Sequence, residues 1–342
     1  MPSLLFFLIR RFANAIVTIL FLILLIFLLE HIIAPSPLAL ARIFAGNPKA
    51  PISELDQIIG EYHFNAPLQV QFYLYLVNLL HGNLGTDSIY KIPETDIIGR
   101  YMPITLELVL IGLVLAIVLG IFTGTIAASR KGGAVDQTIK AIYLITWASP
   151  PFIVAFILQL VIAYDLGLLP ASGLVDPTLV APHAYTGFPL IDSLLAGNSV
   201  YFWSTVQHLV LPALSLAVTT FGVATRIMRS SMIDALDKDY IKLAYMKGFS
   251  KRQVVYRTAF KNAIGPIITL SALFFGTATA GAVIVEDIFQ YHGIGFFTVQ
   301  AILNLDNVAI LAIAVIVGIS VIIANLIADI LYGVADPRIR LE

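Results

Sequence analysis

The chain has no cysteine and little charge for its length. The absence of Cys from its 342 residues excludes disulfide bonds, thiol nucleophiles and thiolate metal sites. Only 12% of the residues are charged, about half of the roughly 25% typical of soluble domains, whereas 59% are hydrophobic. This composition predicts an integral membrane protein rather than a soluble protein with a large core.

Motifs for catalysis, metal binding and nucleotide binding are also missing. There is no G-x-x-x-x-G-K-[ST] motif and no Gly-Lys pair, so the chain cannot cradle a nucleotide phosphate by the P-loop mechanism. The six His residues lack metal-ligand spacing, and no serine lies in a nucleophile elbow. We therefore expect no catalytic residue, no metal site, no cofactor and no enzymatic activity of the chain itself. The net charge of −1 gives no indication of nucleic acid binding.

Six stretches are long and apolar enough to cross a bilayer, which takes about 20 residues of helix. None has the polar face at helical spacing that a buried helix of a soluble protein shows. Their centres hold no acid, base or His, which counts against a proton-coupled secondary carrier. The six stretches are 12–33, 103–128, 141–164, 207–229, 264–287 and 307–333.

Positive charge marks the cytoplasmic side of a membrane protein. Nine Lys and Arg residues lie from Arg226 to Lys261, whereas none lies between Lys140 and Arg226 or between Lys261 and Arg338. Arg10 precedes the first stretch. This distribution predicts a multi-pass protein of the cell membrane with both termini and the 230–262 segment in the cytoplasm, and with the long connection 34–100 outside.

The basic stretch "AYMKGFSKRQVVYRTAFKNAIGP", 244–266, lies between two predicted spans. Residues 237–247 before and within it predict a short helix with Asp237 or Asp239 as the N-cap. Gly248 can adopt the left-handed conformation that ends such a helix.

A second short helix is expected directly after this glycine. Ser250 and Gln253 have the spacing of a capping box, and the helix runs to about Asn262. Pro266 fits the first turn of the following span. The unit is therefore predicted to be helix, glycine turn and helix.

Two interpretations of this unit are open. A basic amphipathic linker on anionic lipid accounts for the charge alone. A docking element for a cytoplasmic partner accounts also for the apolar residues expected to be exposed, which are Leu243, Ala244, Met246 and Phe249.

Pro150 and Pro151 lie about ten residues into the third predicted span. They must interrupt its helical hydrogen bonding and free carbonyl groups that can face a cavity. A simple packing kink is the alternative. The glycine-rich stretches 119–129 and 274–282 are expected to allow close helix packing.

The basic segment resembles the EAA coupling loop of ABC-importer permeases, and more narrowly that of the oligopeptide/dipeptide subfamily. The resemblance rests on Tyr240-Ile-Lys-Leu-Ala244-x-x-Lys247-Gly248, followed by a basic helix and Asn262-Ala263-x-x-Pro266. Lys242 stands where the general consensus has Glu, and Gly265 precedes Pro266 where the consensus has Leu.

Other segments in the family's order extend the resemblance along nearly the whole chain. They are "APLQVQFYLYLVNLLHGNLGTDS" (66–88), "MPITLEL" (102–108), "ASPPFI" (148–153), "HLVLPALSLA" (208–217), "VIVEDIFQYHGIGFF" (283–297) and the closing "DPRIRLE".

The resemblance implies an all-α membrane protein with six transmembrane helices and the type I ABC importer permease fold. It implies an N-terminal transmembrane helix at 1–34 and an external loop region at 35–99. The transmembrane type-1 domain, with five helices and the coupling segment 230–262, follows at 100–333, and a cytoplasmic tail at 334–342.

The resemblance also implies a function that depends on partners. The expected partners are a second homologous permease, cytoplasmic P-loop ATPase subunits, an external solute-binding protein and membrane lipid. The 237–262 loop would couple the chain to the ATPase, with Ala244, Tyr245, Met246, Lys247 and Gly248 as the coupling residues. The expected solute is a di- or oligopeptide. An oligosaccharide importer of the same class and, more distantly, a secondary carrier, a channel or a membrane enzyme stay open as alternatives.

Overall fold

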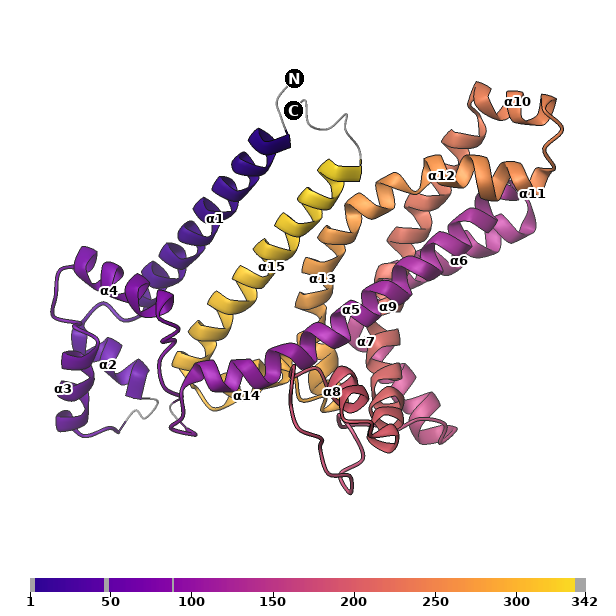
Figure 1. The fold of residues 1–342 in the computed structure, drawn as a ribbon. Helices are drawn as coiled ribbons and strands as arrows, with labels where there is room; N and C mark the ends of the chain where they lie inside the picture. Colours follow the sequence, from indigo (N-terminus) through magenta and orange to yellow (C-terminus); the bar gives the residue numbers. More distant parts are fainter. Residues whose placement is uncertain (1–3, 46–48, 88, 336–342) are drawn as a thin grey trace. The chain divides into compact units, whose positions relative to one another are not determined.

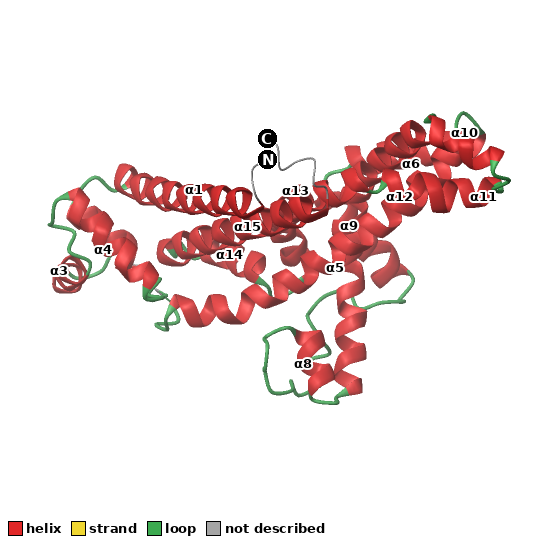
Figure 2. Ribbon diagram, turned by 45° about the horizontal axis from the view of Figure 1, so that its top comes forward, coloured by secondary structure: helices red, strands yellow, loops and turns green. Residues whose placement is uncertain are grey.

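The computed structural model describes residues 4–45, 49–87 and 89–335, and the described residues are almost entirely helical (Figures 1 and 2). They contain no strand, although Thr86 and Pro93 form one isolated antiparallel bridge. The described part of the chain divides into two compact units. The first contains residues 4–104 and 292–326, and the second contains 105–291 and 327–335.

The first unit combines the beginning of the chain with helices from near its end. In it, α1 packs against α15 through Ile23, Ile26 and Val315, and Leu22 lies against Gly318. Its helices are α1 (Leu4–Ile33), α2 (Pro37–Ala45), α3 (Ile52–Glu61), α4 (Leu68–Leu80), α14 (Ile294–Leu303), the start of α5 (Glu94–Ser129) and most of α15 (Asn307–Ala335).

The second unit is organised around the long helix α9 (Ser199–Leu236), against which α6, α7, α8, α12 and α13 pack. The other elements are α6 (Ala134–Ala148), α7 (Pro151–Leu158), η1 (Gln159–Asp165), α8 (Pro189–Leu195), α10 (Asp239–Met246), α11 (Lys251–Gln253), η2 (Val254–Ala259), α12 (Phe260–Ala263) and α13 (Gly265–Phe289).

Four helices of the described chain are long and apolar enough to span a membrane, namely α1, α5, α9 and α15. The pair formed by α6 and α7 counts as a fifth if the two helices are one broken span. The predicted stretch 264–287 corresponds to α13, which has 25 residues. The all-helical membrane architecture is therefore confirmed. The predicted count of six spans is not reproduced in full, because four or five helices of the described residues qualify by length and composition.

Several helices extend beyond the apolar stretches from which they were predicted. Helix α5 begins at Glu94 and includes Pro103, and α9 extends from Ser199 to Leu236, well beyond the apolar stretches. The cause is that a helix continues outside the bilayer wherever its backbone bonds are satisfied, whereas hydropathy detects only the apolar part. The region 35–99, predicted as an external loop, contains α2, α3 and α4. The predicted tail 334–342 lies almost wholly outside the described residues.

Glycines bring α5 and α9 into close contact. A Cβ built on Gly120 would lie 2.4 Å from the Cβ of Ala224, and one on Gly124 would lie 2.7 Å from the Cβ of Met228. Thr123 and Thr225 share a hydrogen bond of 2.9 Å between their hydroxyl groups at the same contact. Small residues therefore allow the two backbones to approach, as the sequence predicted for 119–129.

Replacing Gly124 by Ala should destabilise the protein by about 1–3 kcal/mol, because the new methyl group has no room beside Met228 and the Thr225 carbonyl. Gly99→Ala in the same helix is the matched control. No atom lies within 4 Å of a Cβ at Gly99, so this change should be neutral or stabilise by up to about 1 kcal/mol. Thermal unfolding of both variants in detergent measures the difference, and equal stabilities would contradict the packing assignment.

Candidate functional site

The segment that follows α9 folds as the predicted helix, glycine turn and helix. Helix α10 ends in a Schellman motif, in which the Phe249 N–H donates to the Ala244 carbonyl at 3.1 Å and the Gly248 N–H to the Tyr245 carbonyl at 2.9 Å. Gly248 has a φ of +82°, in the left-handed region. The glycine turn between the two helices is therefore confirmed.

The N-terminus of α10 differs from the prediction. Its N-cap is Lys238, no side chain caps the helix, and Asp239 is its first residue. Asp239 forms an exposed ion pair of 2.8 Å with Lys242 instead. The Asp239 carboxylate is therefore paired with a side chain and caps no N–H group of the helix.

The second helix begins with the predicted capping box. The Ser250 N–H donates to Gln253 Oε1 at 2.8 Å, and the Gln253 N–H donates to Ser250 Oγ at 3.4 Å. The helix then widens into the π-helical turn η2 and returns to α-helix in α12. The π-helical turn was not predicted, because no local sequence signal marks it.

One face of the segment is buried in a common core with α9. Ile241 and Ala244 of α10 lie in this core with Val254 and Val255 of η2. Met228 and Met232 contribute from α9, and both are fully buried. Tertiary packing therefore stabilises the two short helices, which are too short to be stable in isolation.

The opposite face of the segment exposes large apolar side chains. We call these residues the apolar patch; they are Tyr240 (36% exposed), Leu243 (47%), Tyr245 (48%), Met246 (77%) and Phe249 (42%). Lys247, Lys251 and Arg252 beside it are also exposed. An apolar surface rimmed by cations indicates a binding surface rather than an ordinary solvated turn.

The predicted coupling residues therefore divide into two groups. Tyr245, Met246, Lys247 and Gly248 are exposed on the surface of the segment. The expectation that Ala244 is exposed is wrong, because it is only 5% exposed and packs in the core below. The geometry of α10 points the side chain at position 244 toward the core. The sequence alone did not indicate which apolar residues of α10 face the core and which face the surface.

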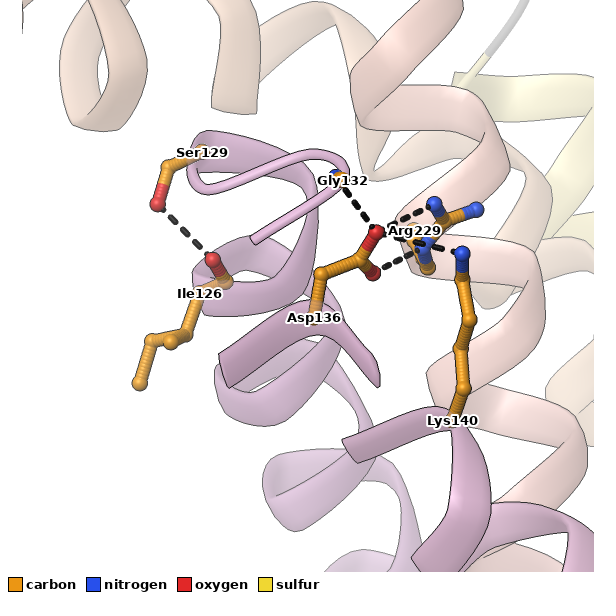
Figure 3. A network of polar contacts seen from close by, with 6 residues as sticks. All are labelled: Ile126, Ser129, Gly132, Asp136, Lys140 and Arg229. Carbon is orange, nitrogen blue, oxygen red and sulfur yellow. Dashed lines mark hydrogen bonds and ion pairs between the residues drawn. The ribbon is translucent and has the colours of Figure 1, made fainter. Parts of the chain in front are cut away.

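A buried ion pair connects the base of this segment to the α5–α6 turn (Figure 3). Asp136, in the first turn of α6, accepts hydrogen bonds from Arg229 Nε at 2.6 Å and Arg229 Nη2 at 2.9 Å. It also accepts from the Gly132 N–H at 2.9 Å, and Lys140 Nζ lies 3.2 Å away. The Asp136 side chain is fully buried. Such a bidentate pair fixes both the distance and the orientation of the two helices.

The sequence analysis missed this contact. Asp136 and Arg229 are 93 positions apart, and neither belongs to a local motif. Arg229 directly follows Met228 in α9, and Met228 belongs to the core on which α10 and η2 pack. Asp136 and Arg229 therefore hold the helices on which the segment packs and form no part of the apolar patch.

Pro150 and Pro151 interrupt the helix between α6 and α7. Helix α6 ends at Ala148, α7 begins at Pro151, and the two axes differ by 105°. Gln159, beyond the break, donates to the Ala171 carbonyl at 2.8 Å and the Ile288 carbonyl at 3.1 Å. These bonds tie η1 to the connection that follows it and to α13. Within the second unit, α7 lies apart from α10 (Figure 1), so the predicted prolines and coupling residues form separate sites.

Arg229→Gln should destabilise the protein by about 2 kcal/mol, because it leaves the buried Asp136 carboxylate with only Lys140 and the Gly132 N–H. Adding Asp136→Asn should restore part of that loss, since the pair is coupled. Lys131→Ala is the control, because Lys131 and Asp237 form an exposed pair of 3.8 Å whose loss should cost less than about 0.5 kcal/mol. The readout is thermal unfolding in detergent. Similar losses in Arg229→Gln and Lys131→Ala would show that the pair has no such role.

Comparison with known proteins places this chain among transport permeases. The family model "Binding-protein-dependent transport system inner membrane component" matches residues 116–341, and the model of the N-terminal part of such components matches residues 4–92.

Curated relatives match along almost their whole length. The probable D,D-dipeptide transport system permease DdpB of Escherichia coli is 35% identical over 92% of this chain and 91% of its own. The dipeptide transport system permease DppB of Escherichia coli is 32% identical over 98% of both chains. The oligopeptide transport system permease AppB of Bacillus subtilis is 33% identical over 98% of this chain and 99% of its own. The chain belongs to the family of inner membrane components of binding-protein-dependent transport systems.

Proposed function

We propose that the chain is one of two similar permease subunits of an ATP-driven importer for di- or oligopeptides. The peptide specificity rests on the relatives, which are named as dipeptide, D,D-dipeptide and oligopeptide permeases. The importer would further contain separate P-loop ATPase subunits, which hydrolyse ATP, and an external solute-binding protein, which delivers the peptide.

The observation that carries the proposal is the apolar patch on a rigid base. Met246 is 77% exposed at the end of α10, and Leu243 and Tyr245 are about half exposed beside it. A mobile loop that merely joined two spans would not need a Schellman motif, a capping box and a shared core to hold these side chains in place. We assign the patch as the surface that docks into the ATPase.

Transmission of movement follows from the same geometry. The segment shares its core with α9, and the Asp136–Arg229 pair fixes α9 to the start of α6. A displacement of α10 by the ATPase would therefore move α6 and α9 together. With the 230–262 segment and both termini in the cytoplasm, as the positive charges predict, the ATPase acts from the side on which ATP is available.

The translocation pathway would use the corner between α6 and α7. Backbone groups at membrane depth are tolerated outside a helix only where they face protein or a water-filled cavity. Pro150 lacks an N–H, and its carbonyl accepts hydrogen bonds from the N–H groups of Ile153 and Val154 in the first turn of α7. We assign Pro150 and Pro151 to the pathway, with the second permease contributing the other half.

The experiment is to purify the intact importer by a tag on this chain and to reconstitute it in liposomes. Mass spectrometry should identify a second permease, P-loop ATPases and a binding protein. The vesicles should accumulate a labelled peptide when ATP is present. Accumulation of an oligosaccharide instead would leave the importer class intact and replace its solute. Recovery of the chain alone, with the segment bound only to anionic lipid, would contradict the proposal.

Gly248→Val should uncouple ATP hydrolysis from peptide uptake in the same vesicles, with uptake reduced about tenfold or more. Nothing lies within 4 Å of a Cβ at this position, so the effect arises from the φ of +82°, which a β-branched residue rarely adopts. Gly248→Asn is the matched control and should retain most of the uptake, because Asn tolerates the left-handed conformation. Unchanged uptake in Gly248→Val would remove the turn from the coupling mechanism.

A further inference from the structure

Three acidic side chains from distant parts of the sequence meet in the interior of the first unit. Asp87 lies in the turn before α5, Glu94 is the first residue of α5, and Asp306 directly precedes α15. One carboxylate oxygen from each lies within 4.8 Å of the other two. Their exposed fractions are 1%, 0% and 1%. Carboxylates repel one another at this distance, and burial increases the repulsion.

Two of the three acids have bonds that account for their positions. Asp87 Oδ1 accepts from the Ile89 N–H at 2.8 Å and also from the Tyr90 N–H, and so shapes the turn before α5. Asp306 Oδ1 accepts from the Ala309 N–H at 3.1 Å and so caps α15.

Glu94 has no such explanation. Its backbone N–H donates to the Gly85 carbonyl at 3.0 Å, but neither of its carboxylate oxygens has a hydrogen-bond partner, although the side chain is fully buried. A buried carboxylate without a partner is strongly unfavourable unless a proton or a cation neutralises it. Because it points toward two further acids, a cation can satisfy all three at once.

The turns that present these acids are closely fitted to each other. The turn before α5 is closed by the bridge between Thr86 and Pro93 and by the bond from the Asp87 N–H to the Ile92 carbonyl at 3.0 Å. A Cβ on Gly85 would lie 2.8 Å from a methyl carbon of Val308 in the first turn of α15. The three carboxylates are thus held by backbone that is fixed before any ligand binds.

The ligand set indicates the kind of ion. Three carboxylates with no His among them favour a hard cation such as Ca²⁺ or Mg²⁺ over zinc or copper. A divalent ion would neutralise the three carboxylates and connect the turn before α5, α5 itself and α15.

We propose that Asp87, Glu94 and Asp306 bind one Ca²⁺ or Mg²⁺ ion that fastens the first unit. The sequence predicted no metal site, because no local ligand spacing is present and the fold alone brings these residues together. With the 34–100 connection outside the cell membrane, as the charge distribution predicts, the site would be exposed to external divalent ions. The proposal is independent of the solute and of the ATPase.

The test uses the full chain in detergent, stripped with EDTA and then supplied with CaCl₂ or MgCl₂ at matched ionic strength. At about 100 times the dissociation constant, the unfolding temperature should rise by roughly 5 °C or more. Isothermal titration should show one ion per chain. Asp96→Asn is the control, because Asp96 is an exposed acid in the same first turn of α5 and should leave the response unchanged.

Glu94→Gln should abolish the rise with both cations, and in EDTA it should be at least as stable as the unmodified chain because it removes a buried charge. Asp306→Asn should also lose the response. The absence of both a temperature rise and binding heat in the unmodified chain would overturn the proposal and indicate that shared protons neutralise the cluster. A full response in Glu94→Gln would overturn it too. If a variant fails to fold, isothermal titration of the unmodified chain with Ca²⁺ or Mg²⁺ still shows whether the ion binds.

Discussion

The buried ion pair between Asp136 and Arg229 is the contact on which the proposed coupling mechanism depends. Its two charges join the start of α6 to α9 at the level where the coupling segment packs. An apolar contact at this place could slide, whereas a bidentate pair has one favourable geometry. A displacement of the segment can therefore be transmitted to α6 and α9. A sliding contact would instead lose it in local rearrangement.

The rest of the second unit is consistent with such transmission. Gly120 and Gly124 bring α5 within contact distance of α9, and α6 packs against α9 as well. Lipid offers no hydrophobic force that would hold these helices together, and close packing with a few polar contacts must replace it. The prolines between α6 and α7 add a corner of 105° to this packing.

The parts of the fold that could be predicted are those that depend on neighbouring residues. Hydropathy located the spanning helices, Gly248 marked the left-handed turn, and Ser250 with Gln253 gave the capping box, because each effect acts within one turn of helix. The burial of Ala244 could not be predicted, since it depends on which face of α10 meets α9.

Contacts between residues far apart in the sequence could not be predicted, because they too depend on tertiary packing. Asp136 and Arg229 meet across 93 positions, and Asp306 meets Asp87 and Glu94 across more than 200. No local pattern encodes such a meeting, so a single sequence gives no signal for either. The resemblance to peptide permeases provided the family, but it indicated neither the buried ion pair nor the acidic cluster.

Site-specific cross-linking from Met246 tests the central claim most directly. The chain has no cysteine, so Met246→Cys introduces a single exposed thiol, and Val200→Cys, 64% exposed near the other end of α9, provides a matched thiol. A short thiol-reactive cross-linker in native membranes should join position 246, and not position 200, to a P-loop ATPase identified by mass spectrometry. If position 246 forms no link to an ATPase while it remains reactive to a soluble maleimide, the apolar patch does not couple this permease to ATP hydrolysis.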